Sequence, residues 1–245
     1  MKARELYQAG KLNEAIQSLQ AELRDSPTDV ARRTFLFELL CFAGEYDRAE
    51  KHLDILGDAN VDSATGSLLY RAALNAERNR NSLFEKGDYP VMPADSPPIR
   101  GSLNGQPFEE IEDADPRIGP RLEVYAAGQY VWLPLAHVAS VEMQAPKRLR
   151  DLLWIPALVK TGPTFKGAEL GEVLIPALSP FSFRQSDDAV RLGRLTVWSE
   201  PEPGNPVPFG QKTLLVDGED FPLLEVRSLE IAAAEPSPEL HASAQ

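Results

Sequence analysis

Hydrophobic and polar residues follow two different spacings along the chain. Up to about residue 86, apolar side chains recur every three or four positions, as on one face of an α-helix. Beyond about residue 120 they alternate with polar residues, as in a strand with one buried face. With glycines and prolines as boundaries, the first pattern predicts helices over residues 2–10, 12–24, 28–43, 46–56 and 63–85.

A short internal repeat organises the helical part. Residues 10–15 (GKLNEA) recur as residues 44–49 (GEYDRA), so the period is 34 residues, which is that of tetratricopeptide repeats. In each copy the glycine ends one helix, an apolar residue begins the next, and the small alanine lets the two helices approach closely. Two and a half such hairpins cannot bury their apolar faces alone, so we expect the rest of the chain to support them.

Two roles are open for these hairpins. They form either a groove for a partner helix or a plain helical cap on the remainder of the chain. The last predicted helix carries an apolar stripe made of Leu68, Leu69, Ala72 and Ala76. On the repeat pattern, the groove-facing positions of the second unit are Thr34, Glu38, Cys41 and Phe42.

The second part of the chain is predicted to be mainly β-sheet. Because no strand–helix–strand rhythm is present, the sheet is expected to be antiparallel and curled, or a small barrel. A tight turn is predicted at Gly128 and another at residues 217–218. Residues 149–154 favour a short helical turn, and strands are predicted over 122–125, 129–133, 138–143, 193–198, 213–216 and 223–231.

These patterns define the expected domains. Residues 87–101 contain four prolines and two glycines, a composition typical of an extended connector. The sequence therefore predicts an α+β protein with tetratricopeptide-like helical hairpins over 1–88, a linker over 89–101 and a mainly antiparallel β-sheet domain over 102–231. The small and polar residues of 232–245 predict a disordered tail.

Composition and charge narrow the function. Hydrophobic residues make up 43% and charged residues 25%, which is the range of folded globular proteins. A net charge of −12 argues against wrapping of nucleic acid, because phosphates need a surplus of Lys and Arg. There is no apolar run of about 18 residues and no signal-like N-terminus, so no membrane partner and a cytoplasmic location are expected.

The sequence contains few residues suited to catalysis. The three histidines, His52, His137 and His241, are far apart in the sequence, and the single cysteine, Cys41, lies in an apolar run. Residues 204–213 resemble a phosphate-binding loop, but the glycine spacing is one residue too long, and two prolines remove backbone donors. We therefore predict no enzyme activity, no catalytic residue, no metal site and no cofactor.

The densest charge feature is a run of carboxylates. Three interpretations are open: a metal site, a docking patch for a basic partner, or a solvated loop. As a docking patch it would use the residues Glu109, Glu110, Glu112, Asp113 and Asp115.

Several blocks resemble one known family. Besides residues 10–16, they are residues 33–45 (RTFLFELLCFAGE), 150–157 (RDLLWIPA), 172–178 (EVLIPAL), 191–198 (RLGRLTVW) and 210–215 (GQKTLL). Together these blocks are similar to the ImpE/TagJ (SciE-type) proteins, and they span nearly the whole chain apart from the linker and the tail.

The resemblance implies an accessory protein of the bacterial type VI secretion system. Such proteins associate with the small sheath subunit through a helix near that subunit's N-terminus, and they are linked with the ClpV-type AAA+ unfoldase. The resemblance transfers no catalytic residue. Two alternatives remain at this point: a metal-dependent enzyme that uses the carboxylates of residues 109–115, and a chaperone for a secreted effector.

Overall fold

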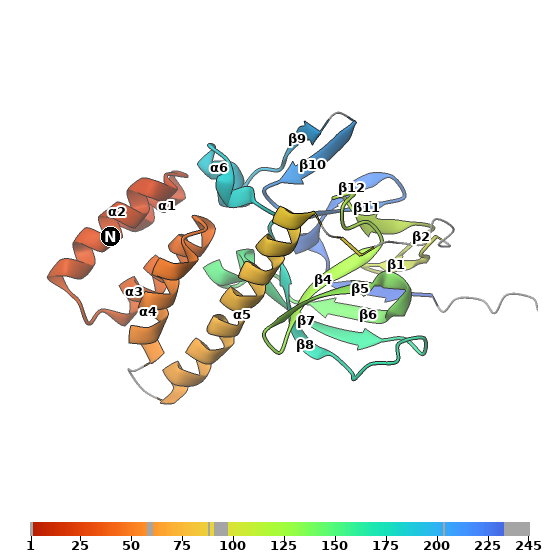
Figure 1. Cartoon of the computed structure of the whole chain (residues 1–245), viewed down its shortest axis with the longest axis horizontal. Coiled ribbons are helices and arrows are strands. Elements are labelled where there is room, and N and C mark those ends of the chain that lie inside the picture. The colour runs from red at the N-terminus through yellow and green to blue at the C-terminus, as the bar shows by residue number, and fades with distance from the viewer. Residues whose placement is uncertain (1, 58–60, 88, 91–97, 203, 233–245) are drawn as a thin grey trace, which may run out of the picture.

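Helices precede strands along the chain, and the longest helix lies between the other helices and the sheet (Figure 1). The computed structural model describes residues 2–57, 61–87, 89–90, 98–202 and 204–232. The predicted α+β class is confirmed. The five successive helices are α1 (Lys2–Gln8), α2 (Leu12–Asp25), α3 (Val30–Phe42), α4 (Tyr46–Gly57) and α5 (Val61–Lys86).

The repeat predicted the helical turns correctly. Gly10 and Gly44 both adopt positive φ, at 76° and 72°, where a side chain is disfavoured. In each copy the next backbone N–H bonds to a carbonyl five residues earlier, at 2.9 Å. Helix α3 begins after Asp29, whose carboxylate accepts a hydrogen bond from the backbone N–H of Arg32 at 2.9 Å. Among the described helices, none is long and apolar enough to span a membrane.

All strand pairs are antiparallel. Eight strands form the main sheet in the order β2-β1-β13-β6-β7-β8-β4-β5, β12-β11-β3 form a second sheet, and β9 pairs with β10. The strands are β1 (Gly101–Leu103), β2 (Gln106–Phe108), β3 (Ile111–Asp113), β4 (Arg121–Ala126), β5 (Gln129–Pro134), β6 (Val138–Met143), β7 (Trp154–Thr161), β8 (Gly171–Pro176), β9 (Val197–Glu202), β10 (Asn205–Phe209), β11 (Thr213–Val216), β12 (Glu219–Pro222) and β13 (Ser228–Ile231). A one-turn helix, α6 (Asp188–Arg191), precedes β9.

Some predicted strands differ from the observed ones. Strands β6 and β11 match their predictions, and the β4–β5 turn places Gly128 at positive φ. The strand predicted over 223–231 is wrong in its first half, because Leu223–Glu225 form a 3-10 turn. The strand predicted over 193–198 begins only at Val197, since Gly193 at positive φ ends α6.

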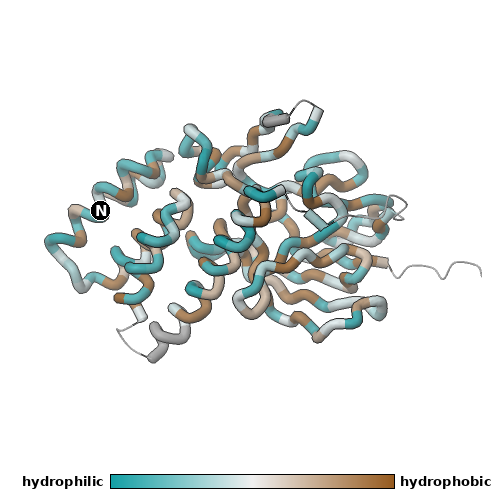
Figure 2. The backbone as a smooth tube through the Cα atoms, in the orientation of Figure 1, coloured by the Kyte–Doolittle hydropathy of each residue, from teal (hydrophilic) through white to brown (hydrophobic). Residues whose placement is uncertain are grey.

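Two hydrophobic clusters hold the molecule together. One fills the interior of the sheets, where Figure 2 shows long hydrophobic stretches of chain. The other joins the helices to the sheet, because Tyr125, Trp154 and Leu174 pack with residues of α1 to α5. The helical hairpins therefore bury their apolar faces against the sheet domain. Pro90 and residues 98–100 have no regular structure, while 91–97 of the predicted linker and 233–245 of the predicted tail lie outside the described residues.

Candidate functional site

A buried ion network joins α5 to both sheets. The carboxylate of Glu123, on β4, accepts two hydrogen bonds from the Arg80 guanidinium, at 2.7 and 2.8 Å. It also accepts one from the Lys212 ammonium at 2.5 Å, and that ammonium reaches Asp113 on β3 at 2.6 Å. All four side chains are at most 2% exposed. We call Arg80, Asp113, Glu123 and Lys212 the buried ion network.

The contacts in this network shift the pKa values of its two carboxyl groups in opposite directions. Burial alone would raise the pKa of Glu123, but the charges of Arg80 and Lys212 outweigh burial and hold that pKa well below its usual range. Burial raises the pKa of Asp113, with Lys212 opposing and Glu123 reinforcing the shift. The lysine of the segment that resembles a phosphate loop is thus engaged with two carboxylates inside the protein.

A second polar chain continues from the network along α5. Glu77, three residues before Arg80, accepts hydrogen bonds from the Tyr125 hydroxyl and, at 3.1 Å, from the indole N–H of Trp154. Tyr130 donates to Glu123 at 2.5 Å. The bonds to Glu77 fix one face of α5 against β4 and β7, so the helix is held by directional contacts as well as by apolar packing.

The acidic run does not form one surface. Glu109 and Glu110 are exposed, but Asp113 and Asp115 are 2% and 0% exposed. Asp115 forms a salt bridge with Arg117 at 2.5 Å. The predicted five-residue docking patch, Glu109, Glu110, Glu112, Asp113 and Asp115, is therefore wrong as one patch: β3 alternates its side chains and turns Asp113 inward. Among the described residues, no three His, Cys, Asp or Glu are grouped as metal ligands would be.

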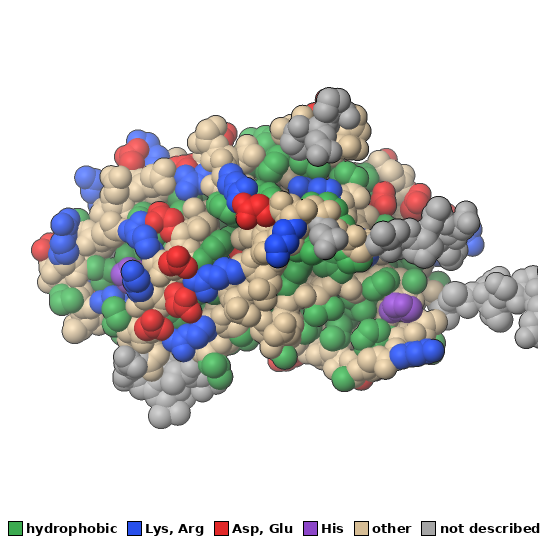
Figure 3. Space-filling view, in the orientation of Figure 1, with side chains coloured by type: hydrophobic (Ala, Val, Ile, Leu, Met, Phe, Trp, Pro, Cys, Tyr) green, Lys and Arg blue, Asp and Glu red, His purple; other side chains and the backbone are tan. Residues whose placement is uncertain are grey.

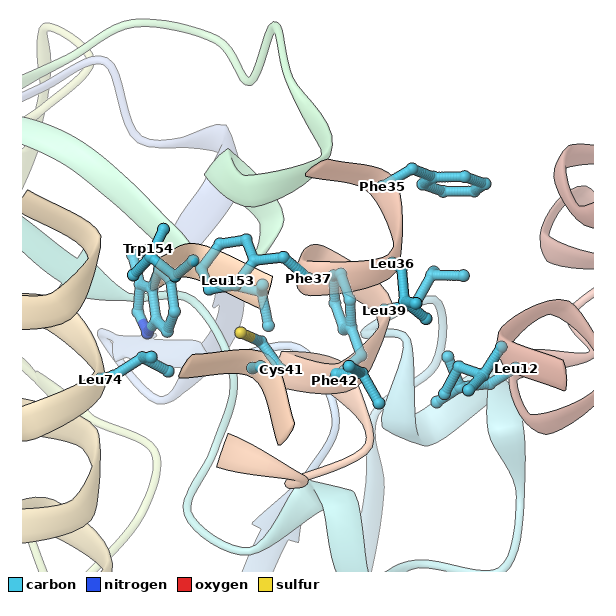
Figure 4. Packing of buried hydrophobic residues seen from close by; sticks show 14 of the residues in the cluster. Leu12, Phe35, Leu36, Phe37, Leu39, Cys41, Phe42, Leu74, Leu153 and Trp154 are labelled. Atoms are coloured by element: carbon cyan, nitrogen blue, oxygen red, sulfur yellow. The ribbon is translucent and has the colours of Figure 1, made fainter. Parts of the chain in front are cut away.

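The four predicted groove residues separate into two pairs. Cys41 and Phe42 are 3% and 1% exposed, and they pack among Leu12, Leu74 and Trp154 (Figure 4). Both side chains belong to the core that the helices share with the sheet domain. Thr34 and Glu38 instead line an open groove, described below.

An apolar groove lies between α5 and the main sheet. Residues of the N-terminal half of α5 and of strands β7 and β8 form its walls, and its volume is about 840 Å³. Leu68, Leu69 and Leu158 line it and are 67%, 51% and 36% exposed. Three of the seven exposed large hydrophobic residues of the described chain therefore gather at one place, which is unusual for a surface without a partner.

The β4–β5 turn closes one end of this apolar groove. A Cβ at Gly128 would lie 3.3 Å from the Cβ of Ala72, a tight contact, and the φ of 77° also disfavours a side chain there. The Asn75 amide donates a hydrogen bond to the Gly128 carbonyl at 3.2 Å. The stripe predicted over Leu68, Leu69, Ala72 and Ala76 does not face one core: Ala76 is buried, whereas the two leucines are exposed in the groove.

A basic groove lies on the other side of the 3-10 turn Leu149–Leu152. Its volume is about 660 Å³. Helix α1 contributes Arg4, helix α3 contributes Phe35 and Glu38, and the loop before the turn contributes Lys147 and Arg148. Arg150 also lines it, and its guanidinium lies 4.7 Å from the Tyr70 ring, whose residue lines the apolar groove. The same short turn therefore separates the two grooves.

Glu38 supplies the carboxyl group among the described residues that line the basic groove. It is 8% exposed, and burial raises its pKa from the ordinary 4.5 to about 7, with Arg150 and Arg148 opposing the shift and Asp151 reinforcing it. At neutral pH this carboxyl is therefore close to its point of half-ionisation.

Replacing Glu38 with glutamine is expected to stabilise the protein at alkaline pH. Because the pKa is higher in the folded chain than in the unfolded chain, the wild type loses stability as the pH rises from 4.5 through about 7. The variant lacks this ionisation, so its advantage should reach about 1–3 kcal/mol near pH 8.5 and shrink toward pH 4.5. Denaturant unfolding followed by circular dichroism at several pH values measures this. An advantage that does not change with pH would contradict the assignment.

Two of the histidines have a polar partner nearby, and two of the tryptophans differ in their exposure. His137 pairs with the Thr164 hydroxyl at 2.8 Å beside the Phe165 ring, and His52 lies 3.2 Å from the Arg33 guanidinium. Trp154 is in the core, whereas Trp198 on β9 is 44% exposed. Sequence reasoning found only Thr34 and Glu38 of the basic groove and missed the apolar groove. The adjacent Leu68 and Leu69 were the available signal, since two neighbouring residues of a helix cannot both face a single narrow core stripe.

Known proteins match the chain over most of its length. Residues 105–230 match the family model of the ImpE protein, and residues 6–72 match a tetratricopeptide repeat. The chain is 30% identical to the type VI secretion system accessory component TagJ of Pseudomonas aeruginosa, over 94% of this chain and 91% of that protein.

The fold is also found in a solved structure. The crystal structure of protein VPA1032 from Vibrio parahaemolyticus matches 95% of this chain and 98% of its own, with a TM-score of 0.83 and 20% sequence identity. At that identity the likeness concerns the fold, helices and sheet together. The family model and the relative from Pseudomonas concern the sequence itself, and on both the chain belongs to the ImpE family.

Proposed function

We propose that this protein is a cytoplasmic, non-enzymatic adaptor of a bacterial type VI secretion system. In this role it binds the small sheath subunit through that subunit's N-terminal helix and links the sheath to the ClpV-type unfoldase. Membership of the ImpE family and the name of the Pseudomonas relative, an accessory component, support the secretion role. The apolar groove is the observation that carries the binding role.

The shape of the apolar groove suits a helix. Leu68 and Leu69 stand on α5 on one side, and Leu158 stands on β7 on the other. An amphipathic helix that lies between them would place an apolar anchor every three or four residues against these leucines. Such a contact would remove the exposed apolar surface of these three leucines from water, which favours binding.

The charges around the apolar groove specify the partner further. Glu142, Asp151 and Glu172 line it, and its described lining contains no lysine or arginine. A partner helix with an apolar face and basic residues beside that face is therefore the best complement. We assign this groove to the N-terminal helix of the small sheath subunit.

The polar groups support a role in binding better than one in catalysis. Asp113 and Glu123, which have the strongest electrostatic surroundings, are engaged by Lys212 and Arg80 and are closed off from solvent. A buried and mutually neutralised network of this kind holds elements together. It offers no group that a substrate could reach.

Replacing Leu69 with glutamate is expected to weaken binding of the sheath subunit's N-terminal helix at least tenfold. The substitution places a charge in the apolar groove, where the partner's apolar face would have to desolvate it. Isothermal titration calorimetry of the full chain with a synthetic peptide of that helix measures the effect. Ile55→Glu is the matched control, because Ile55 is also 51% exposed on a helix but does not line the groove.

The control separates the outcomes. Equal folding of both variants, checked by thermal unfolding, with binding lost only in Leu69→Glu, supports the assignment. Binding that survives Leu69→Glu would remove the apolar groove as the site. Absence of binding by the wild-type chain would remove the sheath helix as the partner.

A further inference from the structure

The basic groove gathers four cations around one concave site. On the face shown in Figure 3, acidic and basic side chains lie intermixed over the helices, and Arg78, for example, reaches Asp47 and Glu50 at 2.8 Å each. Within the described part of the chain, none of the four cations of the basic groove forms a salt bridge: Arg4, Lys147, Arg148 and Arg150.

This arrangement is unexpected in a protein of this charge. The chain carries 37 acidic and 25 basic residues, so four cations around one groove reverse its overall charge locally. Four cations around one concave site repel one another, and Glu38 is the one carboxyl among the described residues that line the groove. A groove that concentrates positive charge on an acidic protein is therefore best explained by an acidic occupant.

The groove also has an apolar side. Phe35 is packed edge-on against Tyr7, with ring centroids 5.7 Å apart, and the Arg4 guanidinium lies 5.9 Å from the Phe35 ring. Leu149 and Leu152 line the groove opposite these helical residues. A bound segment can thus place one apolar side chain between the aromatic and aliphatic walls while its carboxylates meet the cations.

The shape and the overall charge favour a peptide over other polyanions. A nucleic acid or an anionic membrane meets a broad surface, and on this protein the surface surrounding the groove belongs to a chain of net charge −12, which repels both. A short extended segment enters a cavity of about 660 Å³ without covering that surface.

We propose that the basic groove is a second partner site, which binds an acidic peptide segment with one apolar anchor. The site is separate from the apolar groove and does not depend on the function proposed for it. The walls that make it are α1, α3 and the loop before the 3-10 turn. The chain therefore presents two neighbouring sites of opposite preference, one for a basic amphipathic helix and one for an acidic segment.

The Glu38 carboxyl adds a pH dependence to this site. The groups that face it are Arg148 and Arg150, whose charges oppose protonation, and Asp151, whose carboxylate is held by the backbone N–H groups of Lys147 and Arg148 at 2.8 and 2.9 Å. Above about pH 7 the ionised Glu38 competes with an acidic peptide for the cations. The Glu38→Gln variant should therefore bind such a peptide several-fold more tightly at alkaline pH.

The test uses the full chain and a fluorescein-labelled peptide of twelve residues in which aspartate and glutamate flank one central leucine. Fluorescence anisotropy at low and moderate salt measures binding. The double reversal Lys147→Glu with Arg148→Glu is expected to weaken binding at least tenfold. Lys51→Glu with Lys166→Glu is the matched control, because it changes the net charge equally at two exposed lysines outside the groove.

Each outcome decides the proposal. Binding that is lost in the groove variant and kept in the control supports it, provided that both variants unfold at the wild-type temperature. Equal loss in both variants means attraction by net charge alone and overturns it. Tighter binding of a single-stranded oligonucleotide or of phosphatidylglycerol vesicles than of the peptide also overturns it, as does no binding of the peptide by the wild type.

Discussion

Replacing Glu123 with alanine is expected to lower the free energy of unfolding by about 3–5 kcal/mol, the cost of leaving buried charges without their partner. Arg80 and Lys212 would both lose their shared carboxylate at positions that are 2% exposed or less. Because this carboxylate joins β4 to Arg80 of α5 and to Lys212 just before β11, the loss should be global rather than confined to one element. Urea unfolding followed by circular dichroism and by tryptophan fluorescence measures it.

Glu110→Ala provides the control for this experiment. Glu110 is exposed, so its replacement should change the unfolding free energy by less than about 0.5 kcal/mol. The double variant Arg80→Ala with Glu123→Ala should be less unstable than the sum of its single variants, because each removes the same contact. A Glu123→Ala protein as stable as the wild type would mean that these groups are solvated rather than buried.

Replacing Phe42 with alanine is expected to lower the free energy of unfolding by about 3–5 kcal/mol, because it leaves a cavity in the core that the helices share with the sheet. Phe42 is 1% exposed and belongs to the cluster that joins the helices to the sheet. The repeat pattern placed this residue in a partner groove, where its loss would reduce binding and leave folding intact. Thermal unfolding together with peptide titration distinguishes the two roles.

Val30→Ala is the matched control on the same helix. Val30 is 50% exposed, so we expect a change in unfolding free energy within about 0.5 kcal/mol. A Phe42→Ala protein that unfolds at the wild-type temperature but no longer binds the sheath helix peptide would show that Phe42 belongs to the binding surface.

Local structure was readable from the sequence because its causes are local. Gly10 and Gly44 mark helix ends through their own conformational freedom, and the spacing of apolar residues sets the helical faces. The turn at residues 217–218 was found for the same reason, since Asp217 and Gly218 both take positive φ. Strand β7 was missed because Pro156 interrupts it and its pairing with β6 and β8 is decided by distant residues.

The sites could not be read in this way because they depend on pairs far apart in the chain. Lys212 resembled part of a phosphate loop, and only the fold places it beside Glu123, 89 positions away. The acidic run appeared to be a surface feature until the pleat of β3 turned Asp113 inward. Thr34 and Glu38 were found from the repeat, but the loop at Lys147 and Arg148 that completes their groove follows from tertiary packing.

The position of Lys212 near the end of the chain also sets the order in which the molecule can be completed during synthesis. Asp113 and Glu123 leave the ribosome long before the ammonium group that both of them contact. Until then Asp113 lacks the cation that it contacts, and Glu123 has only Arg80, so burial of the two carboxylates is opposed. We therefore expect the nascent helical hairpins to remain undocked until Lys212 and strand β11 have emerged.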